Sequence, residues 1–276
     1  MEGSLMDNRA VGIFDSGVGG LSVLKEINKI LPFEELIYLG DMARFPYGPK
    51  SLSEVRGFVY EIVDFLYRLN VKMIIIACNT ATAAGLECIR DKYDVPILGV
   101  ISPGAQAACS RSKRGRIGVI STKATAQSGM YEHAIMGLNH NCMVFTRACP
   151  RLVELIEDGV LNGEVLSSQL REYLEPLVAK DIDTLILGCT HYPLIEEEIK
   201  KIIDEDITII SSARETARSV REYLISKDML RDDIPSSNMK FISTGGMKSF
   251  QEVGSIFLGK RITDIEIVNL RNGGGH

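Results

Sequence analysis

Residues Thr184–Leu194 read TLILGCTHYPL, a short apolar strand that stops at Cys189 and gives way to Thr, His and the start of a helical pattern. Residues Met73–Thr82 read MIIIACNTAT and repeat this arrangement around Cys78. Short apolar runs with such boundaries are typical of buried strands in parallel sheets. We therefore expect each cysteine to lie where a buried strand ends and a helix begins.

Strands and helices alternate along the rest of the chain. Helical spacing predicts helices over 21–31, 52–69 and 213–225. Apolar runs predict further strands at Val11–Phe14, Leu36–Leu39, Val95–Val100, Ile117–Thr122, Met143–Thr146 and Ile207–Ile210, and a last strand with its turn at Phe241–Gly246. Alternation of this kind favours parallel sheets with helices on both faces, which is the α/β class.

The pattern occurs twice in the chain. Residues 117–122 echo residues 11–16 at an offset of 106 (117 − 11), and residues 143–146 echo residues 37–40 at the same offset (143 − 37). The Cys189 segment echoes the Cys78 segment at an offset of 111 (189 − 78). Three echoes in the same order predict two similar α/β halves.

Composition excludes several classes of protein. The chain has 276 residues, of which 45% are hydrophobic, so it is long enough for two domains with apolar cores. Its net charge of −5 gives no basic excess for binding nucleic acid, and the cluster Arg111, Lys113, Arg114 and Arg116 is interpreted as a solvated loop. No apolar run reaches the roughly 18 residues of a membrane helix.

The chain ends are expected to be loose. Met1–Arg9 is a polar leader without the pattern of a secretory signal, and residues 272–276 form a glycine-rich tail. We therefore expect a cytoplasmic protein. In that reducing compartment the six cysteines are more often core residues or reactive thiols than disulfides.

Polar clusters at four predicted strand ends indicate a ligand site. In open parallel sheets, ligands bind at the carboxyl ends of the strands. A thiol at a helix N-terminus has its pKa lowered, and such a terminus also binds anions. The hydroxyls of Thr80 and Thr190 could cap these helices or donate to a ligand carboxylate. The clusters are Asp15-Ser16, Cys78-Asn79-Thr80, Ser121-Thr122 and Cys189-Thr190-His191.

Each candidate also has a plain structural interpretation. A cysteine at a strand end is more often packed than catalytic, and Cys88, Cys109, Cys142 and Cys149 are assigned to that class. Cys78 and Cys189 differ because polar residues follow them directly, and a core would leave those groups unpaired. His191 alone is consistent with a cap, and Asp15 with a turn.

Common cofactor motifs are missing. The glycines at 17, 19 and 20 do not complete the dinucleotide fingerprint, and no P-loop occurs. The sequence has no Cys-x-x-Cys pair and no second histidine near His191, so we expect no zinc site and no metal. No pyridoxal phosphate signature is evident, although the sequence alone leaves a Schiff-base lysine open.

These motifs together resemble the glutamate racemases of the aspartate/glutamate racemase family. The resemblance covers roughly Val11 to Gly259. No single stretch is specific, but their order along the chain is. The matching stretches are GIFDSGVGGLSVL at Gly12–Leu24, Pro46-Tyr47-Gly48, ACNTATA at Ala77–Ala83, GVIST at Gly118–Thr122 with Thr125 beyond it, and GCTHYPL at Gly188–Leu194.

The resemblance implies roles for individual residues. Cys78 and Cys189 would be the two catalytic bases, on the D-glutamate and L-glutamate sides respectively. Asp15 would be the acid–base partner of Cys78, and His191 that of Cys189, with Glu157 assisting at the cleft unless it is only an exposed helix acid. The implied substrate shell comprises Asp15, Ser16, Pro46, Tyr47, Gly48, Cys78, Asn79, Thr80, Thr122, Cys189, Thr190 and His191.

The resemblance also implies the architecture. We expect two three-layer αβα domains with mainly parallel sheets, related by pseudo-twofold symmetry, with the active site in the cleft between them. The first domain would comprise residues 1–101 and 212–276, and the second residues 102–211. A homodimer is expected. Where the family often has Thr-Gly-Asp near the C-terminus, this chain has Thr244-Gly245-Gly246, remote from the predicted cleft residues.

The implied activity is cofactor-independent racemisation of glutamate, which supplies D-glutamate for peptidoglycan. One thiolate would remove the α-proton and the opposite thiol would deliver a proton to the other face. Donors around the α-carboxylate would stabilise the growing charge. The open alternatives are aspartate racemase or a related Cys/Cys isomerase or decarboxylase, a non-catalytic two-lobed amino-acid-binding protein, and a phosphate-handling enzyme that uses the loop after Asp15.

Overall fold

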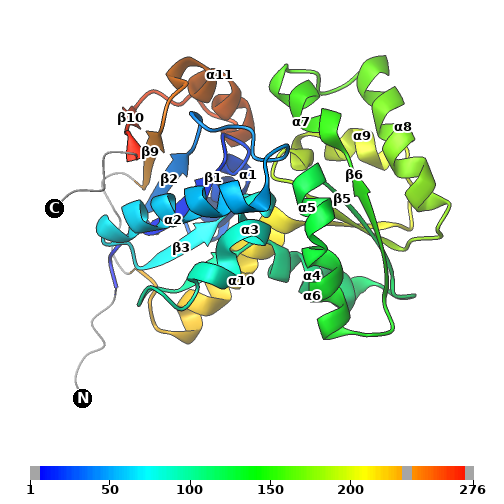
Figure 1. Ribbon diagram of the computed structural model, residues 1–276, viewed down its shortest axis with the longest axis horizontal. Helices are drawn as coiled ribbons and strands as arrows, with labels where there is room; N and C mark the ends of the chain where they lie inside the picture. Colours follow the sequence, from blue (N-terminus) through cyan, green and yellow to red (C-terminus); the bar gives the residue numbers. More distant parts are fainter. Residues whose placement is uncertain (1–6, 232–237, 271–276) are drawn as a thin grey trace.

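Two parallel β-sheets with helices packed around them form the molecule (Figure 1). The computed structural model describes residues 7–231 and 238–270. Most of the expected loose ends, residues 1–6 and 272–276, lie outside this part of the chain. Within the described residues, no helix has the length and hydropathy that crossing a membrane requires.

The first sheet has six strands in the order β10-β9-β2-β1-β3-β4, and every neighbouring pair is parallel. The second sheet has four parallel strands in the order β6-β5-β7-β8. Their bounds are β1 Val11–Asp15, β2 Leu36–Gly40, β3 Met73–Ile76, β4 Ile97–Gly99, β5 Arg116–Ser121, β6 Met143–Ala148, β7 Thr184–Gly188, β8 Thr208–Ser211, β9 Met239–Ser243 and β10 Ile265–Ile267.

The two sheets repeat one topology. The order β2-β1-β3-β4 in the first sheet corresponds to β6-β5-β7-β8 in the second, strand for strand along the chain. Strands β1, β2, β3 and β7 are buried along their whole length, as expected for strands covered by helices on both faces. The predicted α/β class with two similar halves is therefore confirmed, while a pseudo-twofold relation between the halves stays a prediction.

Helices cover the sheets with their apolar faces inward. In α2, for example, the buried residues include Val55, Val59, Ile62 and Leu66, at helical spacing. The helices are α1 Leu21–Ile30, α2 Leu52–Arg68, α3 Asn79–Ile89, α4 Ile101–Arg111, α5 Lys123–Ser128, α6 Met130–Leu138, α7 Pro150–Glu157, α8 Glu164–Val178, α9 Glu196–Lys200, α10 Ser212–Ser226 and α11 Met247–Leu258, with a 3₁₀ helix at Tyr192–Ile195.

The C-terminal segment adds to the first sheet. Helix α10 follows β8 and packs against both α1 and α4, and β9 then pairs with β2. Figure 1 shows α11, β9 and β10, in orange and red, on the same side of the molecule as the blue strands. The division into domains 1–101 with 212–276 and 102–211 stays a prediction.

A buried ion pair connects the segment after α10 to the start of the chain. Lys72 is fully buried, and its Nζ lies 2.7 Å from the carboxylate of Glu34, which is 2% exposed. The same nitrogen donates to the carbonyl oxygens of Asp7 and Met229, each at 2.7 Å. Lys72 thus connects the N-terminal residues, the turn before β2 and the segment after α10.

We predict that Lys72→Met destabilises the fold by about 3–5 kcal/mol, because it leaves the Glu34 carboxylate buried without a counter-charge. Urea unfolding monitored by circular dichroism measures this loss. The double variant Lys72→Met/Glu34→Gln should recover most of it, since no buried charge then remains. A single variant within 1 kcal/mol of wild type would contradict the prediction.

Candidate active site

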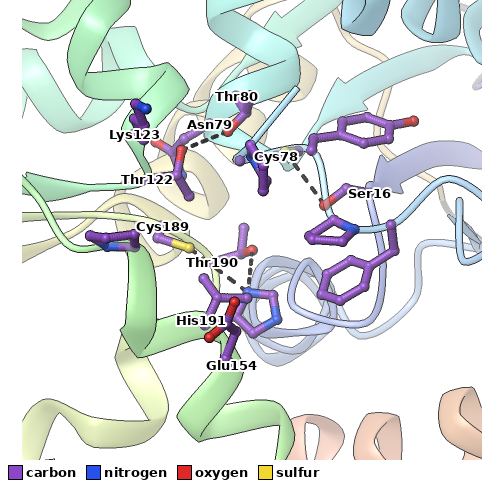
Figure 2. Close-up of a pocket in the computed structure, with 17 residues that line it drawn as sticks. Ser16, Cys78, Asn79, Thr80, Thr122, Lys123, Glu154, Cys189, Thr190 and His191 are labelled. Carbon is purple, nitrogen blue, oxygen red and sulfur yellow. Dashed lines mark hydrogen bonds between the residues drawn. The ribbon is translucent and has the colours of Figure 1, made fainter. Parts of the chain in front are cut away.

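The carboxyl ends of strands from both sheets surround one cavity of about 120 Å³ (Figure 2). This volume is roughly ten times the space that a single water needs, so the cavity has room for a small amino acid. Eleven of the predicted site residues line it, and they come from both halves: Ser16, Pro46, Tyr47, Gly48, Cys78, Asn79, Thr80, Thr122, Cys189, Thr190 and His191.

Asp15 and Glu157, the other two predicted residues, lie directly behind the lining. Asp15 is fully buried, and its Oδ1 accepts a hydrogen bond of 2.9 Å from Ser16 Oγ. Glu157 Oε1 lies 2.7 Å from His191 Nε2. The structure therefore brings all thirteen predicted residues together, two of them as partners of lining side chains.

Cys78 is held as a neutral thiol. It is the N-cap of α3, where its Sγ accepts a hydrogen bond of 3.4 Å from the backbone N–H of Ala81. The expected lowering of its pKa by the helix terminus is nevertheless wrong. Burial, reinforced by the negative charge of Asp15, outweighs the N–H donor and raises the pKa of Cys78 to about 12. A thiol with such a pKa keeps its proton at neutral pH.

Cys189 has the opposite surroundings, because its Sγ lies 3.8 Å from His191 Nδ1. The far ring nitrogen of His191 contacts Glu157. Burial disfavours the charged ring, but hydrogen bonds to Cys189 and Glu157 outweigh it and raise the pKa of His191 to about 10. A protonated His191 beside the Cys189 sulfur can provide the counter-charge that a thiolate needs.

Three neighbours fix the imidazole of His191 in this position. The ring stacks on Phe45 with centroids 6.2 Å apart, and it meets Phe257 edge-on at 5.2 Å. A Cβ at Gly19 would lie 2.5 Å from the ring, so only glycine leaves space there. Phe257 belongs to α11, so the C-terminal segment helps to hold a side chain of the second sheet.

Local structure after Cys189 differs from the prediction. The expected helix is a 3₁₀ helix, Tyr192–Ile195, with Pro193 in its first turn, followed by the short helix α9. Thr190 does not act as a cap, because its Oγ1 donates to Asp15 Oδ2 at 3.0 Å. Cys189 therefore has His191, and not a long helix, as its electrostatic partner.

Hydroxyl groups join the two halves beside the cavity. Thr80 Oγ1 lies 2.9 Å from Thr122 Oγ1 and 3.1 Å from Thr125 Oγ1, and the latter two are 3.0 Å apart. Thr122 also caps α5. Thr80 is thus tied to α5 and does not cap its own helix, which Cys78 caps.

The Pro46-Tyr47-Gly48 loop borders the cavity, but the phenol of Tyr47 forms its hydrogen bond outside the cavity. The hydroxyl of Tyr47 donates to the buried carboxylate of Asp41, which also pairs with Arg44 at 2.6 Å. The Tyr47 hydroxyl is therefore not free to contact a ligand, and the rest of the loop remains as the lining.

Sequence reasoning missed several lining residues: Phe45, Pro49, Lys123, Pro150, Val153 and Glu154. Three of these lie on α7 at the spacing of one helical face, which also carries Glu157. Counting back three and four residues from Glu157 would have found Glu154 and Val153. Lys123, the only lysine or arginine in the lining, follows Thr122 directly and is exposed.

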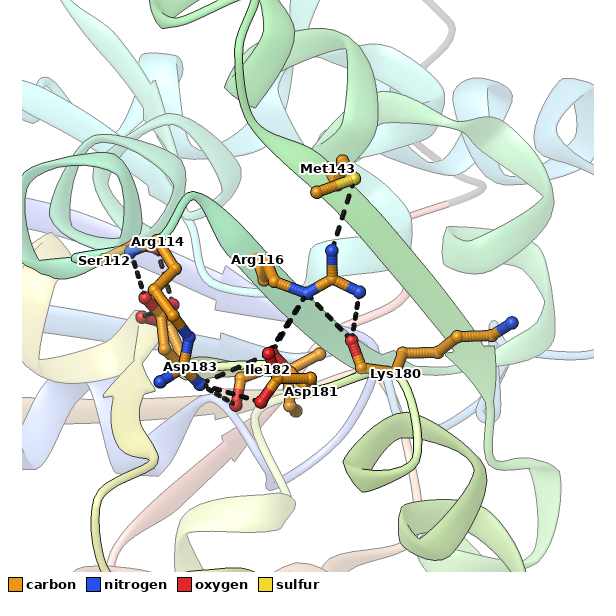
Figure 3. Close-up of polar contacts among 9 residues, drawn as sticks. Ser112, Arg114, Arg116, Met143, Lys180, Asp181, Ile182 and Asp183 are labelled. Atoms are coloured by element: carbon orange, nitrogen blue, oxygen red, sulfur yellow. Dashed lines mark hydrogen bonds and ion pairs between the residues drawn. The ribbon is translucent and has the colours of Figure 1, made fainter.

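Two arginines of the basic cluster, Arg114 and Arg116, lie at the amino end of β5 beside the residues that precede β7 (Figure 3). The expected solvated loop before a strand is found at residues 112–115, where Lys113 and Arg114 are exposed, whereas Arg111 ends α4 and Arg116 begins β5. Arg116 Nε donates to the carbonyls of Lys180 and Asp181, and Arg111 pairs with Glu215 at 2.9 Å. Arg116 thus connects the start of β5 to the residues before β7, and Arg111 connects the end of α4 to α10.

Comparison of this chain with known proteins identifies its family. The model of the Asp/Glu/Hydantoin racemase family matches residues 11–220. The chain belongs to this racemase family. It is 45% identical to a glutamate racemase of Bacillus cereus over 95% of this chain and 98% of the relative.

Solved racemases of this family share the whole fold. The crystal structure of a glutamate racemase isoform from Bacillus anthracis is 45% identical, with a TM-score of 0.90 over 95% of this chain and 98% of that one. A glutamate racemase of Francisella tularensis, crystallised in complex with D-glutamate, is 36% identical with a TM-score of 0.90, covering 96% of this chain and 99% of that one.

The geometry fits the chemistry that racemases perform. Inverting a carbon centre requires removal of a proton from one face and delivery of a proton to the other. Here a thiol and a thiol with a charged imidazole partner line one cavity from different sheets. In the described part of the chain, no group of three or more His, Cys, Asp or Glu side chains could hold a metal ion.

We predict that the His191 ring stays doubly protonated up to a pH of about 10. Glu157→Gln should lower this pKa, because the ring loses a negative partner while its burial remains. Nitrogen-15 NMR titration of histidine-labelled protein measures both values, and the exposed His133 and His140 serve as references. A His191 ring that is neutral at pH 8 in the wild type would contradict the prediction.

Proposed function

We infer that this protein interconverts L- and D-glutamate without a cofactor, and so supplies D-glutamate for peptidoglycan. The observation that carries the inference is the pair of cysteines on one cavity, Cys78 with a raised pKa and Cys189 beside a charged histidine. Membership of the racemase family and the near-complete coverage of glutamate racemases support it.

In the L-to-D direction, the thiolate of Cys189 takes the α-proton of L-glutamate and becomes a thiol. The thiol of Cys78 gives its proton to the opposite face of the carbanion and becomes a thiolate. The C–H bond broken on one face is thus replaced by a C–H bond formed on the other, and configuration inverts. The reverse reaction starts from the exchanged protonation states.

The charged partners support each thiolate in turn. His191 with Glu157 stabilises the thiolate of Cys189. Ser16 lies between Cys78 and Asp15: its Oγ is 3.8 Å from Cys78 Sγ and donates to Asp15. Asp15 keeps the Cys78 proton in place before the reaction, and Ser16 can turn its hydroxyl to the thiolate afterwards.

The carbanion needs donors around the α-carboxylate, where its charge spreads. Asn79 is suited to this task because its Nδ2 is buried without a hydrogen-bond partner in the described protein. The remaining donors are the lining hydroxyls and backbone N–H groups. Burial strengthens these bonds because the cavity has a low effective dielectric constant.

The domain division and the setting of the enzyme belong to the same proposal. The pairing of β9 with β2 supports a first domain of residues 1–101 and 212–276, with residues 102–211 as the second. Six free cysteines support a cytoplasmic location, where thiols stay reduced. A homodimer rests on the family resemblance alone, and light scattering of the purified protein tests it.

We predict that Cys78→Ala and Cys189→Ala each slow glutamate racemisation by at least about 10³-fold, because each removes one of the two proton-transfer groups. Circular dichroism follows the conversion without added cofactor. Cys88→Ala, at a half-buried thiol outside the cavity, is the matched control and should keep wild-type activity.

The same variants test the assignment of faces. In D₂O, Cys78→Ala should exchange the α-hydrogen of L-glutamate but not of D-glutamate, and Cys189→Ala the reverse. Racemisation near the wild-type rate by either variant would refute the two-base mechanism. A wild type faster on aspartate than on glutamate would favour aspartate racemase, and binding of glutamate without Cα exchange would favour a binding protein.

A further inference from the structure

In the side-chain amide of Asn79, the oxygen has a hydrogen-bond partner and the nitrogen has none among the described residues. Its Oδ1 accepts a hydrogen bond of 2.7 Å from the hydroxyl of Tyr131. Its Nδ2 is buried and has no partner within the described residues, although the side chain is only 2% exposed and lines the cavity. A buried donor of this kind is normally satisfied, so the free Nδ2 is available to a ligand acceptor.

Tyr131 reaches this amide from the other half of the molecule. It lies in α6, at 3% exposure, and its ring packs against Gly188 at the end of β7. A Cβ on Gly188 would come within 3.1 Å of the ring, so the absence of a side chain there makes room for it. The tyrosine therefore extends from the residue before Cys189 to the residue after Cys78.

The hydroxyl is suited to donate. Burial raises the pKa of Tyr131, so the phenol keeps its proton at any pH near neutrality. A phenol that donates to Oδ1 fixes which end of the amide faces the cavity, because the two ends of an asparagine side chain are interchanged by a simple rotation.

We propose that Tyr131 is a positioning residue for the racemisation: its hydroxyl holds Asn79 Oδ1 and so turns Nδ2 toward the α-carboxylate of the substrate. This role rests on the proposed function. Without the phenol, the amide is able to rotate, and the rotated form points its carbonyl oxygen at the carboxylate. That form repels the substrate where the held form binds it.

The hydrogen bond also joins the two halves. Tyr131 follows β5 of the second sheet, and Asn79 follows β3 of the first sheet. The amide therefore has its productive orientation only when the two halves lie as close together as they do in this structure. No motif in the sequence indicated Tyr131, which is the second residue of α6.

The test is a double-mutant cycle on glutamate racemisation with wild type, Tyr131→Phe, Asn79→Ala and the double variant. We expect Tyr131→Phe to lower kcat/KM by roughly 10- to 100-fold, mainly through a higher KM, because the carboxylate is already charged in the bound substrate. In the Asn79→Ala background, Tyr131→Phe should change kcat/KM by less than about twofold, because it acts through the amide.

Two controls separate positioning from a general structural effect. Tyr60→Phe removes a hydroxyl that donates to the carbonyl of Cys88 at 3.1 Å, away from the cavity, and should leave kcat/KM unchanged. Thermal unfolding of every variant shows whether a loss of activity follows a loss of stability. Because Tyr131→Phe retains the ring that packs against Gly188, we expect it to fold.

Each remaining outcome overturns the proposal. Tyr131→Phe with wild-type kcat/KM would show that the phenol does not position the amide. Losses that multiply in the double variant would show that the two residues act independently. A wild type that does not racemise glutamate would overturn the proposed function and this role with it, whereas an active wild type with an unaffected Tyr131→Phe overturns only the role of Tyr131.

Discussion

Two thiols that act on one carbon must carry different charges at the same moment. Burial and the charge of Asp15 keep the proton on Cys78, whereas Cys189 faces an imidazole that burial alone would neutralise and that Glu157 helps to keep charged. Each effect depends on exclusion of water, because both thiols are about 5% exposed. The asymmetry is therefore a property of the buried cavity lined by both sheets.

The parallel topology explains how this cavity is built. Strand ends of both sheets meet there, and each contributes a short polar segment in place of a long charged side chain. The hydrogen bonds that cross between the halves at this edge include Thr190 with Asp15, Thr80 with Thr122, and Tyr131 with Asn79. These bonds make the spacing of the halves part of the chemistry, since a wider spacing breaks them and admits water.

Sequence patterns predicted the strand ends well, because an apolar run followed by Cys, Asn, Thr or His is a local signal. They could not predict the pKa of Cys78, since its burial and its distance from Asp15 depend on the tertiary fold. Tyr131 and Phe257 were not predicted for the same reason. The pattern of each helix shows that one face is buried, but not which residues that face contacts. The 3₁₀ helix after Cys189 was missed because its apolar spacing resembles that of an α-helix.

The two-base mechanism is tested most directly by following the hydrogen on the α-carbon during a single conversion of L- to D-glutamate. L-glutamate is converted by the wild-type enzyme in D₂O to low extent, and mass spectrometry measures deuterium in the D-glutamate formed and in the L-glutamate recovered. Two thiols on opposite faces predict deuterium in the product and protium in the recovered substrate. A product that keeps the original protium, or equal deuterium in both enantiomers, would show that a single group serves both faces.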